Sequence, residues 1–357
     1  MDTRFGRRGT RLVQLLLLVM GTSLVAQEWE NPSERYLEAY REYLDASCPL
    51  VDDRIAHFVY FALDREAVRD HQFLQNPRLQ GAQIMYSWRE LEPRRGVYDF
   101  SAIREDLAYL ADHGKTLFVQ LQDATFYNRY VGVPNYLRSR EFDGGAIRQR
   151  TDSGQAEGWV AKRWNQAVRE RFALLLAELG TEFDGRIAGI NLQESAIGVS
   201  NEYDSSFTPQ GYAEGLQANM SALARSFPRS VKLQYANFMP GEWLPWEDNG
   251  YLRSIYEHGE AIGVGLGAPD LMVQRKGQLN HALALMHEGQ YSVPLGIAVQ
   301  DGNYIGQTNS NRVVSERENI VPLLHAFARD FLGVSFIFWS YQEPYFTEDL
   351  LMCVGPR

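Results

Sequence analysis

Glu194 is the carboxylic acid whose sequence context most clearly suggests chemistry. It follows the run Ile190-Asn191-Leu192-Gln193, and the small residues Ser195 to Gly198 then turn the chain away. If that run is a strand, Glu194 leaves its carboxyl end beside the amide of Gln193, which can orient it. A carboxyl group held there can protonate the leaving oxygen of a glycosidic bond as a general acid. The competing interpretation is a structural Glu that caps a helix or pairs with an Arg.

Acid-catalysed cleavage of a glycosidic bond also needs a second carboxylate. Candidates that follow other apolar runs are, in order of preference, Asp301, Glu343, Asp270 and Asp123. Asp301 is preferred because Gly302 lets the backbone turn the shorter side chain inward. Glu343 has the longer reach, and Pro344 fixes the turn beside it. The sequence thus predicts Glu194 as the acid, with Asp301 or Glu343 as its partner.

Amide, carboxylate and tryptophan side chains are enriched just past the apolar runs. Amides and carboxylates can pair with sugar hydroxyls, and aromatic rings can stack on the C–H faces of sugars. Trp339 is expected to act as such a platform, because it ends an apolar run and polar residues follow it. The predicted substrate-binding residues are Trp88, Gln122, Asp123, Gln193, Asn237, Asp270, Gln300 and Trp339.

Eight short runs rich in β-branched and aromatic residues are predicted to be parallel strands buried on both faces. They span residues 55–63, 82–87, 116–121, 187–192, 231–236, 262–267, 293–299 and 334–339. Helical patterns lie between them, including 102–113, 167–180, 209–226 and 319–331, and Gly114, Gly180 and Gly333 suit C-caps. This alternation predicts a single (β/α)8 TIM barrel, whose working residues lie at the carboxyl ends of the strands.

Other segments refine this prediction. A helix at 33–46 is expected to cover the barrel bottom, and the last helix, after Glu348, to be short or absent. The polar, Gly-containing insertion at about 127–164 follows the third strand, so it is expected to lie over the barrel mouth as a wall or lid. A doubly wound open sheet is the alternative fold, but no Gly-rich phosphate loop follows the first strand.

The amino terminus has the order of a Sec-type signal peptide. Four Arg residues precede the apolar run Leu12 to Met20, and small residues lead to a plausible cleavage site after Ala26. The sequence therefore predicts a signal peptide at 1–26, a barrel domain at 27–357, and a secreted or periplasmic protein. The alternative is an uncleaved membrane anchor, although the run is shorter than the roughly 20 apolar residues that span a bilayer.

The composition of the chain limits the classes of molecule that it is expected to bind. The net charge of −10 argues against nucleic acid and anionic membranes, and mildly against polyanionic substrates. Aromatic residues make up 12% of the chain, enough for both a large core and sugar platforms. The two cysteines, Cys48 and Cys353, can pair in an oxidising compartment. The seven His are scattered, so neither a metal nor a cofactor is expected, and the expected partner is a carbohydrate.

The second predicted strand–helix unit carries a family resemblance. The segments Trp88-Arg89-Glu90-Leu91-Glu92-Pro93 and Gly96-Val97-Tyr98-Asp99-Phe100-Ser101 resemble clan A glycoside hydrolases, and are especially similar to the family 42 β-galactosidases. The resemblance covers residues 81–123. It implies an acid/base Glu at the end of strand four, matching Glu194, and an aromatic residue after strand eight, matching Trp339. Where that clan usually has Asn before the acid, this chain has Gln193.

The resemblance breaks at strand seven. The clan places a nucleophilic Glu there, whereas this chain has Gln300-Asp301. Either Asp301 acts after a shift in register, or the enzyme inverts configuration through a carboxylate that activates water. The leading hypothesis is a secreted glycoside hydrolase. The alternatives are a non-catalytic carbohydrate-binding barrel that has lost the nucleophile, and a barrel enzyme of another class, such as a lyase or a transglycosylase.

Overall fold

The computed structural model describes residues 34–51, 53–244, 246–300, 302–305 and 317–355. The predicted signal peptide at 1–26 lies outside the described residues, and so does Asp301, the preferred catalytic partner. Among the described residues, no helix combines the length and the apolar character that crossing a membrane requires.

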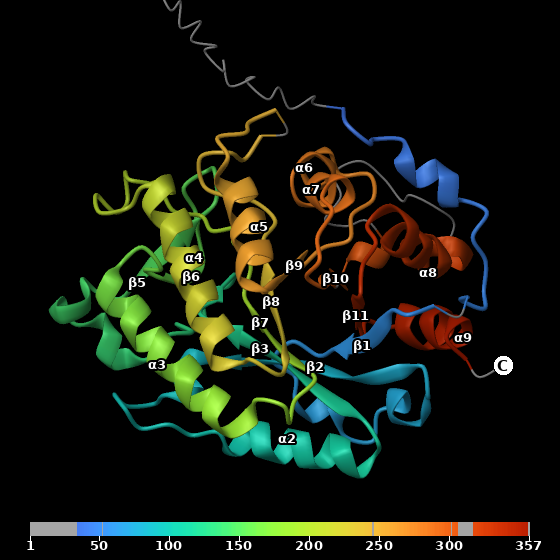
Figure 1. Cartoon of the computed structure of the whole chain (residues 1–357), viewed down its shortest axis with the longest axis horizontal. Helices are drawn as coiled ribbons and strands as arrows, with labels where there is room; N and C mark the ends of the chain where they lie inside the picture. Colours follow the sequence, from blue (N-terminus) through green and yellow to red (C-terminus); the bar gives the residue numbers. More distant parts are fainter. Residues whose placement is uncertain (1–33, 52, 245, 301, 306–316, 356–357) are drawn as a thin grey trace, which may run out of the picture. The chain divides into compact units, whose positions relative to one another are not determined.

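Eight parallel strands close into a barrel in the order β1-β11-β10-β9-β8-β7-β3-β2 (Figure 1). Their bounds are β1 Ala56–Tyr60, β2 Leu79–Ser87, β3 Thr116–Gln122, β7 Gly189–Leu192, β8 Val231–Tyr235, β9 Gly265–Ala268, β10 Leu295–Val299 and β11 Phe336–Ser340. Each strand overlaps one predicted run. The predicted (β/α)8 barrel is therefore confirmed, and the carboxyl ends of all eight strands meet at one mouth.

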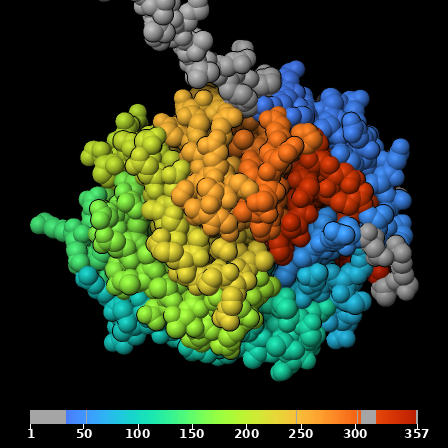
Figure 2. Space-filling view, in the orientation of Figure 1, coloured from blue at the N-terminus to red at the C-terminus, as the bar shows by residue number. Residues whose placement is uncertain are grey.

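Helices alternate with these strands. The longer ones are α2 Ser101–Asp112, α3 Gln166–Phe183, α4 Pro209–Ser226, α5 Tyr251–Ile262, α7 Ala282–Glu288 and α8 Arg317–Ala326, with the shorter α1 Trp88–Leu91, α6 Lys276–Asn280 and α9 Leu351–Cys353. Single turns or π-helical segments are η1 Ala39–Tyr43, η2 Glu66–Val68, η3 Gln72–Gln75, η6 Asn303–Ile305, η7 Phe327–Phe331 and η8 Phe346–Leu350. Figure 2 shows the yellow α4 and the gold α5 side by side on one face.

Two local predictions need correction. Gly180 does not end α3 but lies inside it, where a Cβ would come within 2.1 Å of the Ser226 carbonyl oxygen. Glycine there lets α3 approach the end of α4, so packing explains it rather than capping. In the segment predicted as a helix at 33–46, only Ala39–Tyr43 forms a short 3-10 turn, and it packs beside α8. Gly114 and Gly333 do follow helices with positive φ, as expected.

The barrel interior changes from apolar to polar along its axis. Phe58, Phe118, Leu233 and Phe338 form an apolar cluster. On the same interior, Gln83 donates from Nε2 to Asn191 Oδ1 at 2.9 Å and to the Tyr235 hydroxyl at 3.1 Å. Buried amides need such partners. The interior thus contains a hydrogen-bonded polar layer as well as an apolar one.

The segment after β3 forms a small sheet of its own. Strands β4 Ala124–Thr125, β5 Ala146–Arg150 and β6 Ala156–Ala161 pair antiparallel in the order β4-β6-β5, with η4 Asn135–Arg138 and η5 Arg140–Phe142 between β4 and β5. A Cβ on Gly158 would lie 1.8 Å from the Thr125 carbonyl oxygen, so this pairing requires glycine. Because β4 starts at Ala124, just after β3 ends at Gln122, this small sheet begins at the barrel mouth.

Cys48 and Cys353 form a disulfide that joins the two ends of the described chain, with a Cα–Cα distance of 4.7 Å and a sequence separation of 305 residues. The adjoining Leu50 N–H donates to the Cys353 carbonyl at 2.9 Å.

Replacing both cysteines by serine is expected to lower the free energy of unfolding by about 2–5 kcal/mol, because the unfolded chain regains the freedom that a long closed loop removes. Urea unfolding of the wild type with and without reductant, alongside the double variant, measures this. The reduced wild type should match the variant. Equal midpoints for oxidised wild type and variant would contradict the expectation.

Candidate active site

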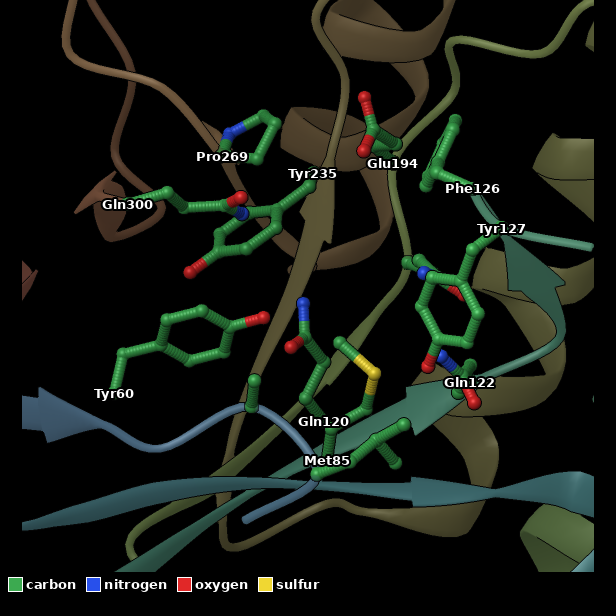
Figure 3. A pocket seen from close by; sticks show the side chains of 13 residues that line it. Tyr60, Met85, Gln120, Gln122, Phe126, Tyr127, Glu194, Tyr235, Pro269 and Gln300 are labelled. Carbon is green, nitrogen blue, oxygen red and sulfur yellow. The ribbon is translucent and has the colours of Figure 1, made fainter. Parts of the chain in front are cut away.

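A cavity of about 220 Å³ opens at the carboxyl ends of the strands. Figure 3 shows Glu194 near its top, Gln300 and Pro269 on one side, and Phe126 and Tyr127 on the other. The described residues that line it are Tyr60, Ala62, Leu63, Met85, Gln120, Gln122, Phe126, Tyr127, Gln193, Glu194, Tyr235, Pro269 and Gln300. The cavity is smaller than the roughly 300–1,000 Å³ of drug-sized sites, so it has room for about one sugar ring.

The carboxyl group of Glu194 is held by its neighbour on the next strand. Asn237, two residues past β8, donates from Nδ2 to Glu194 Oε2 at 2.7 Å. The Asn237 Oδ1 in turn accepts from the Ala196 backbone N–H at 3.2 Å. One amide thus bridges the carboxylate and the turn that follows it, which fixes the orientation of Glu194 at the mouth.

Electrostatics favour the protonated form of Glu194. Burial and the nearby charge of Asp270 raise the pKa of Glu194 to about 8, against the opposing hydrogen bond from Asn237. A carboxyl group with this pKa keeps its proton at neutral pH, as a general acid must.

Asp270 is the carboxylate whose charge acts on Glu194. It lies two residues past β9, and burial raises its own pKa while Asn303 and Arg275 oppose that shift. Asn303 donates from Nδ2 to Asp270 Oδ1 at 3.0 Å and accepts from the Gln300 backbone N–H at 2.9 Å. Asn303 thereby ties the end of the sixth strand to the end of the seventh.

Arg163 holds the backbone of Glu194 in place, a role that was not predicted from the sequence. Its Nη1 donates to the backbone carbonyl of Glu194 and to the Tyr212 hydroxyl, both at 2.7 Å. Its Nε and Nη2 donate to the two carboxylate oxygens of Asp123 at 2.8 and 2.6 Å. Asp123 was expected to bind substrate. It is only 5% exposed and engaged by Arg163, so its position is structural.

Asp123→Ala is expected to lower the free energy of unfolding by about 3–5 kcal/mol, because it leaves the buried Arg163 guanidinium without its counter-charge. Chemical denaturation measures this change, and Asp152→Ala, at an exposed Asp, serves as the matched control. A loss below about 1 kcal/mol for Asp123→Ala would show that Arg163 does not depend on it.

The two tryptophans expected to bind sugar do not line the cavity. Trp339 is 0% exposed, and its indole N–H donates to His57 Nδ1 at 3.1 Å. Trp88 is 1% exposed, packs against Phe172 and donates to Glu92 Oε2 at 2.9 Å. Neither ring has a free face for a sugar. Both expectations are corrected by the partners that the folded chain supplies to each indole N–H.

Of the remaining predicted residues, three line the cavity and Glu343 does not. Gln122, Gln193 and Gln300 line the cavity with Glu194, although the Gln193 Oε1 also accepts the backbone N–H of Ala124 at 2.9 Å. Glu343 is exposed and accepts the Thr347 backbone N–H at 3.2 Å, so it caps the start of the last helical segment and lies outside the cavity lining. This placement removes the support for Glu343 as catalytic partner.

Several lining residues were missed because they lie within strands rather than after them. The alternation of side chains along a strand could have identified them. Gln120 and Gln122 are two residues apart in the otherwise apolar β3, so both side chains face the barrel interior. A polar residue in a strand buried on both faces is itself a marker of an interior site. The other missed residues are Tyr60, Ala62, Leu63, Met85, Phe126, Tyr127, Tyr235 and Pro269.

Away from the mouth, Asp53, His57 and His325 bring ligand-type atoms within 4.8 Å of one another. Asp53 Oδ2 lies 2.6 Å from His325 Nε2, and burial lowers the pKa of His325 to about 4. Since the Trp339 indole only donates, His57 accepts through Nδ1, while its Nε2 lies 3.8 Å from Asp53 Oδ1. Metal-binding His rings show the reverse arrangement. We therefore interpret these residues as two hydrogen-bonded pairs, Asp53 with His325 and His57 with Trp339.

Comparison with known proteins finds similar structures but no similar curated sequence. No protein-family model and no curated protein matches the sequence. The structure is similar to the catalytic domain of β-amylase from Paenibacillus polymyxa, with a TM-score of 0.55 and 10% identity over 81% of this chain and 92% of that one. Endo-glycoceramidase II from Rhodococcus sp. gives a TM-score of 0.51 and 13% identity over 85% and 79%.

A third similar structure is GH5_18 from Streptomyces cattleya in complex with GlcNAc, with a TM-score of 0.50 and 12% identity over 81% of this chain and 71% of that one. The chain therefore has a TIM-barrel fold similar to that of these three structures, at low sequence identity. Similarity at this level establishes the fold alone, so activity has to be argued from the site.

Proposed function

We propose that this protein is a glycoside hydrolase in which Glu194 is the general acid. The observation that carries the proposal is the state of Glu194: it leaves the fourth barrel strand into a cavity, held by Asn237, with its pKa raised to about 8. Such a carboxyl group donates its proton to the glycosidic oxygen as the bond breaks. The named similar structures, several of them glycosidases, agree with this reaction class.

Asp270 is the proposed second carboxylate. Like Glu343 it is not among the residues that line the cavity, but it is partly exposed next to Pro269, which does line it, and its charge acts on Glu194. Neighbouring carboxyl groups resist simultaneous ionisation, and the hydrogen bond from Asn303 and the charge of Arg275 favour the ionised form of Asp270. Glu194 then keeps the proton, which gives the acid and base states that glycosidic cleavage requires. Asp270 either attacks the anomeric carbon or takes a proton from the attacking water, depending on the separation of the two groups. Asp301 remains the competing candidate.

The proposed substrate is a neutral sugar unit. Among the described residues that line the cavity, Glu194 is the single charged one, and none is a Lys or Arg that could pair with a uronate or a phosphate. Four glutamines supply amide donors and acceptors, while Tyr60, Met85 and Tyr235 supply apolar surface. The proposed location is the periplasm or the cell exterior, supported by the signal-like amino terminus and the Cys48–Cys353 disulfide.

The second candidate function is a carbohydrate-binding barrel without catalysis. It is favoured by Gln300, which lines the cavity at the strand-seven end where the resemblance implies a nucleophile.

One experiment separates these functions. Wild type and Glu194→Gln are screened against 4-nitrophenyl glycosides of neutral sugars and of uronic acids, and against neutral polysaccharides. Hydrolysis of a neutral glycoside by wild type alone supports the proposal. Saccharide binding without hydrolysis by either protein supports the binding barrel. Equal hydrolysis of a neutral polysaccharide by both proteins refutes the role of Glu194, because its leaving oxygen needs protonation.

A further inference from the structure

The loop between β8 and α5 presents large apolar side chains to solvent at the barrel mouth. Trp243 is 41% exposed, Leu244 44% and Trp246 58%. We call Trp243 and Trp246 the tryptophan pair. Side chains of this size are seldom exposed together unless they meet a ligand or a partner.

This loop is held in a defined shape. Glu242 is buried, and its carboxylate accepts the backbone N–H groups of Asn249 at 2.8 Å, Tyr251 at 3.2 Å and Leu252. Glu247 closes a second turn, with its carboxylate accepting the Leu244 N–H at 3.0 Å and its own N–H donating to the Leu244 carbonyl at 2.9 Å. Trp243 precedes this second turn and Trp246 lies within it. A surface built in advance binds without the entropy loss of ordering a loop.

The tryptophan pair is connected to the candidate active site. The loop begins with Asn237, which holds Glu194, and the next residue, Phe238, stacks on Trp243 with ring centroids 5.9 Å apart and planes at 24°. On the other side, the Arg275 guanidinium lies 5.9 Å from the Phe238 ring centroid. Arg275 follows Asp270 in the next mouth loop. Trp243 therefore stands on the rim between the strands that supply the two proposed catalytic carboxyl groups.

We infer that the tryptophan pair is a second binding site, which stacks neutral sugar units of a saccharide chain that extends out of the cavity past Glu194. The inference rests on the proposed function and deepens it: the enzyme acts on oligo- or polysaccharides rather than on small glycosides alone. A cavity with room for about one sugar ring leaves the rest of such a chain outside. Exposed indole faces beside that opening offer the apolar surface that pyranose C–H faces require.

The charges of the loop disfavour a lipid surface as the occupant. Its ionisable side chains are Glu242, Glu247 and Asp248, and it contains no Lys or Arg, whereas anionic membranes attract basic segments. A protein partner is also a poor match. Specific interfaces bury about 800 Å² on each side, which three exposed side chains do not supply.

The first test uses the substrate found by the hydrolysis screen. The variants are Trp243→Ala/Trp246→Ala, the aromatic-retaining Trp243→Phe/Trp246→Phe, and Leu174→Ala as a control at an exposed apolar residue on α3. We expect the double Ala variant to lower kcat/KM roughly tenfold or more for a tetrasaccharide of that sugar, but not for its 4-nitrophenyl monoglycoside, with the Phe variant between. Equal losses on both substrates, or no loss on the tetrasaccharide, overturn the inference.

A second test does not depend on hydrolysis. Wild type and the double Ala variant are run in native gels that contain galactomannan, xyloglucan, mixed-linkage β-glucan or galactan. Retardation of wild type that the variant loses supports the inference even if no glycan is cleaved. Absence of retardation in all four gels overturns it. Sedimentation with phosphatidylcholine vesicles that depends on the same two tryptophans also overturns it, by assigning the surface to lipid.

Discussion

Glu194→Gln is expected to lower turnover by about 10³-fold or more, while the variant stays folded. Glutamine preserves the size of the side chain and can accept the hydrogen bond from Asn237, but it has no proton to give to a leaving oxygen. Loss of a general acid typically removes a factor of about 10²–10⁴. The measurement is kcat on two leaving groups: an activated 4-nitrophenyl glycoside should suffer less than an oligosaccharide, because its leaving oxygen needs less protonation.

The same variant is expected to be more stable than wild type at neutral and alkaline pH. Burial raises the pKa of Glu194 from 4.5 to about 8, so ionisation is disfavoured in the folded state. The stabilisation of wild type from this group is therefore complete below about pH 4.5 and is lost as pH rises to about 8. Since one pKa unit corresponds to about 1.4 kcal/mol, Glu194→Gln should gain up to about 3 kcal/mol near pH 7.

Unfolding curves at pH 4 and pH 8 measure this gain, with Glu202→Gln as a control at an exposed Glu. The difference between Glu194→Gln and wild type should widen with pH, whereas the control should remain within about 0.5 kcal/mol of wild type. A variant that loses activity but shows no pH-dependent stability change would mean that Glu194 ionises freely, which contradicts the general-acid assignment.

Asp270→Ala is expected to have the second large effect, a fall in turnover of several orders of magnitude. It removes the carboxylate proposed to attack the sugar or to activate water. Removing the negative charge next to Glu194 should also lower the pKa of Glu194, because like charges raise each other's pKa. The alkaline limb of the pH–rate profile should therefore move to lower pH in Asp270→Asn, a change that a purely structural role would not produce.

The configuration of the wild-type product distinguishes the possible roles of this carboxylate: retention indicates a nucleophile and inversion a base that activates water. In either role azide should restore turnover of Asp270→Ala by direct displacement and form a glycosyl azide of inverted configuration. Asp301→Ala is the comparison variant. Full activity in Asp270→Ala combined with loss in Asp301→Ala would move the role to strand seven, in agreement with the family resemblance.

The sequence alone determined the barrel and the placement of its acid. Eight runs that are apolar on both faces can be satisfied only by parallel strands covered by helices, so their number and spacing predicted the fold. Glu194 was identified for the same reason: a carboxyl group directly past a buried strand must emerge at the mouth. The sequence also carried a signal that the prediction missed: Gln120 and Gln122 repeat with the period of a strand, so both face the barrel interior.

The tertiary structure decided which polar side chains are free to meet a ligand. Trp339 lies near the end of β11 and Asp123 directly follows β3, yet His57 and Arg163 engage them across 282 and 40 residues respectively. Likewise, only packing brings the charge of Asp270 to Glu194, while Glu343 caps the segment beside it. A strand end fixes where a side chain emerges, but its partner depends on hydrogen bonds that form when distant segments meet, and those contacts leave no local pattern in the sequence.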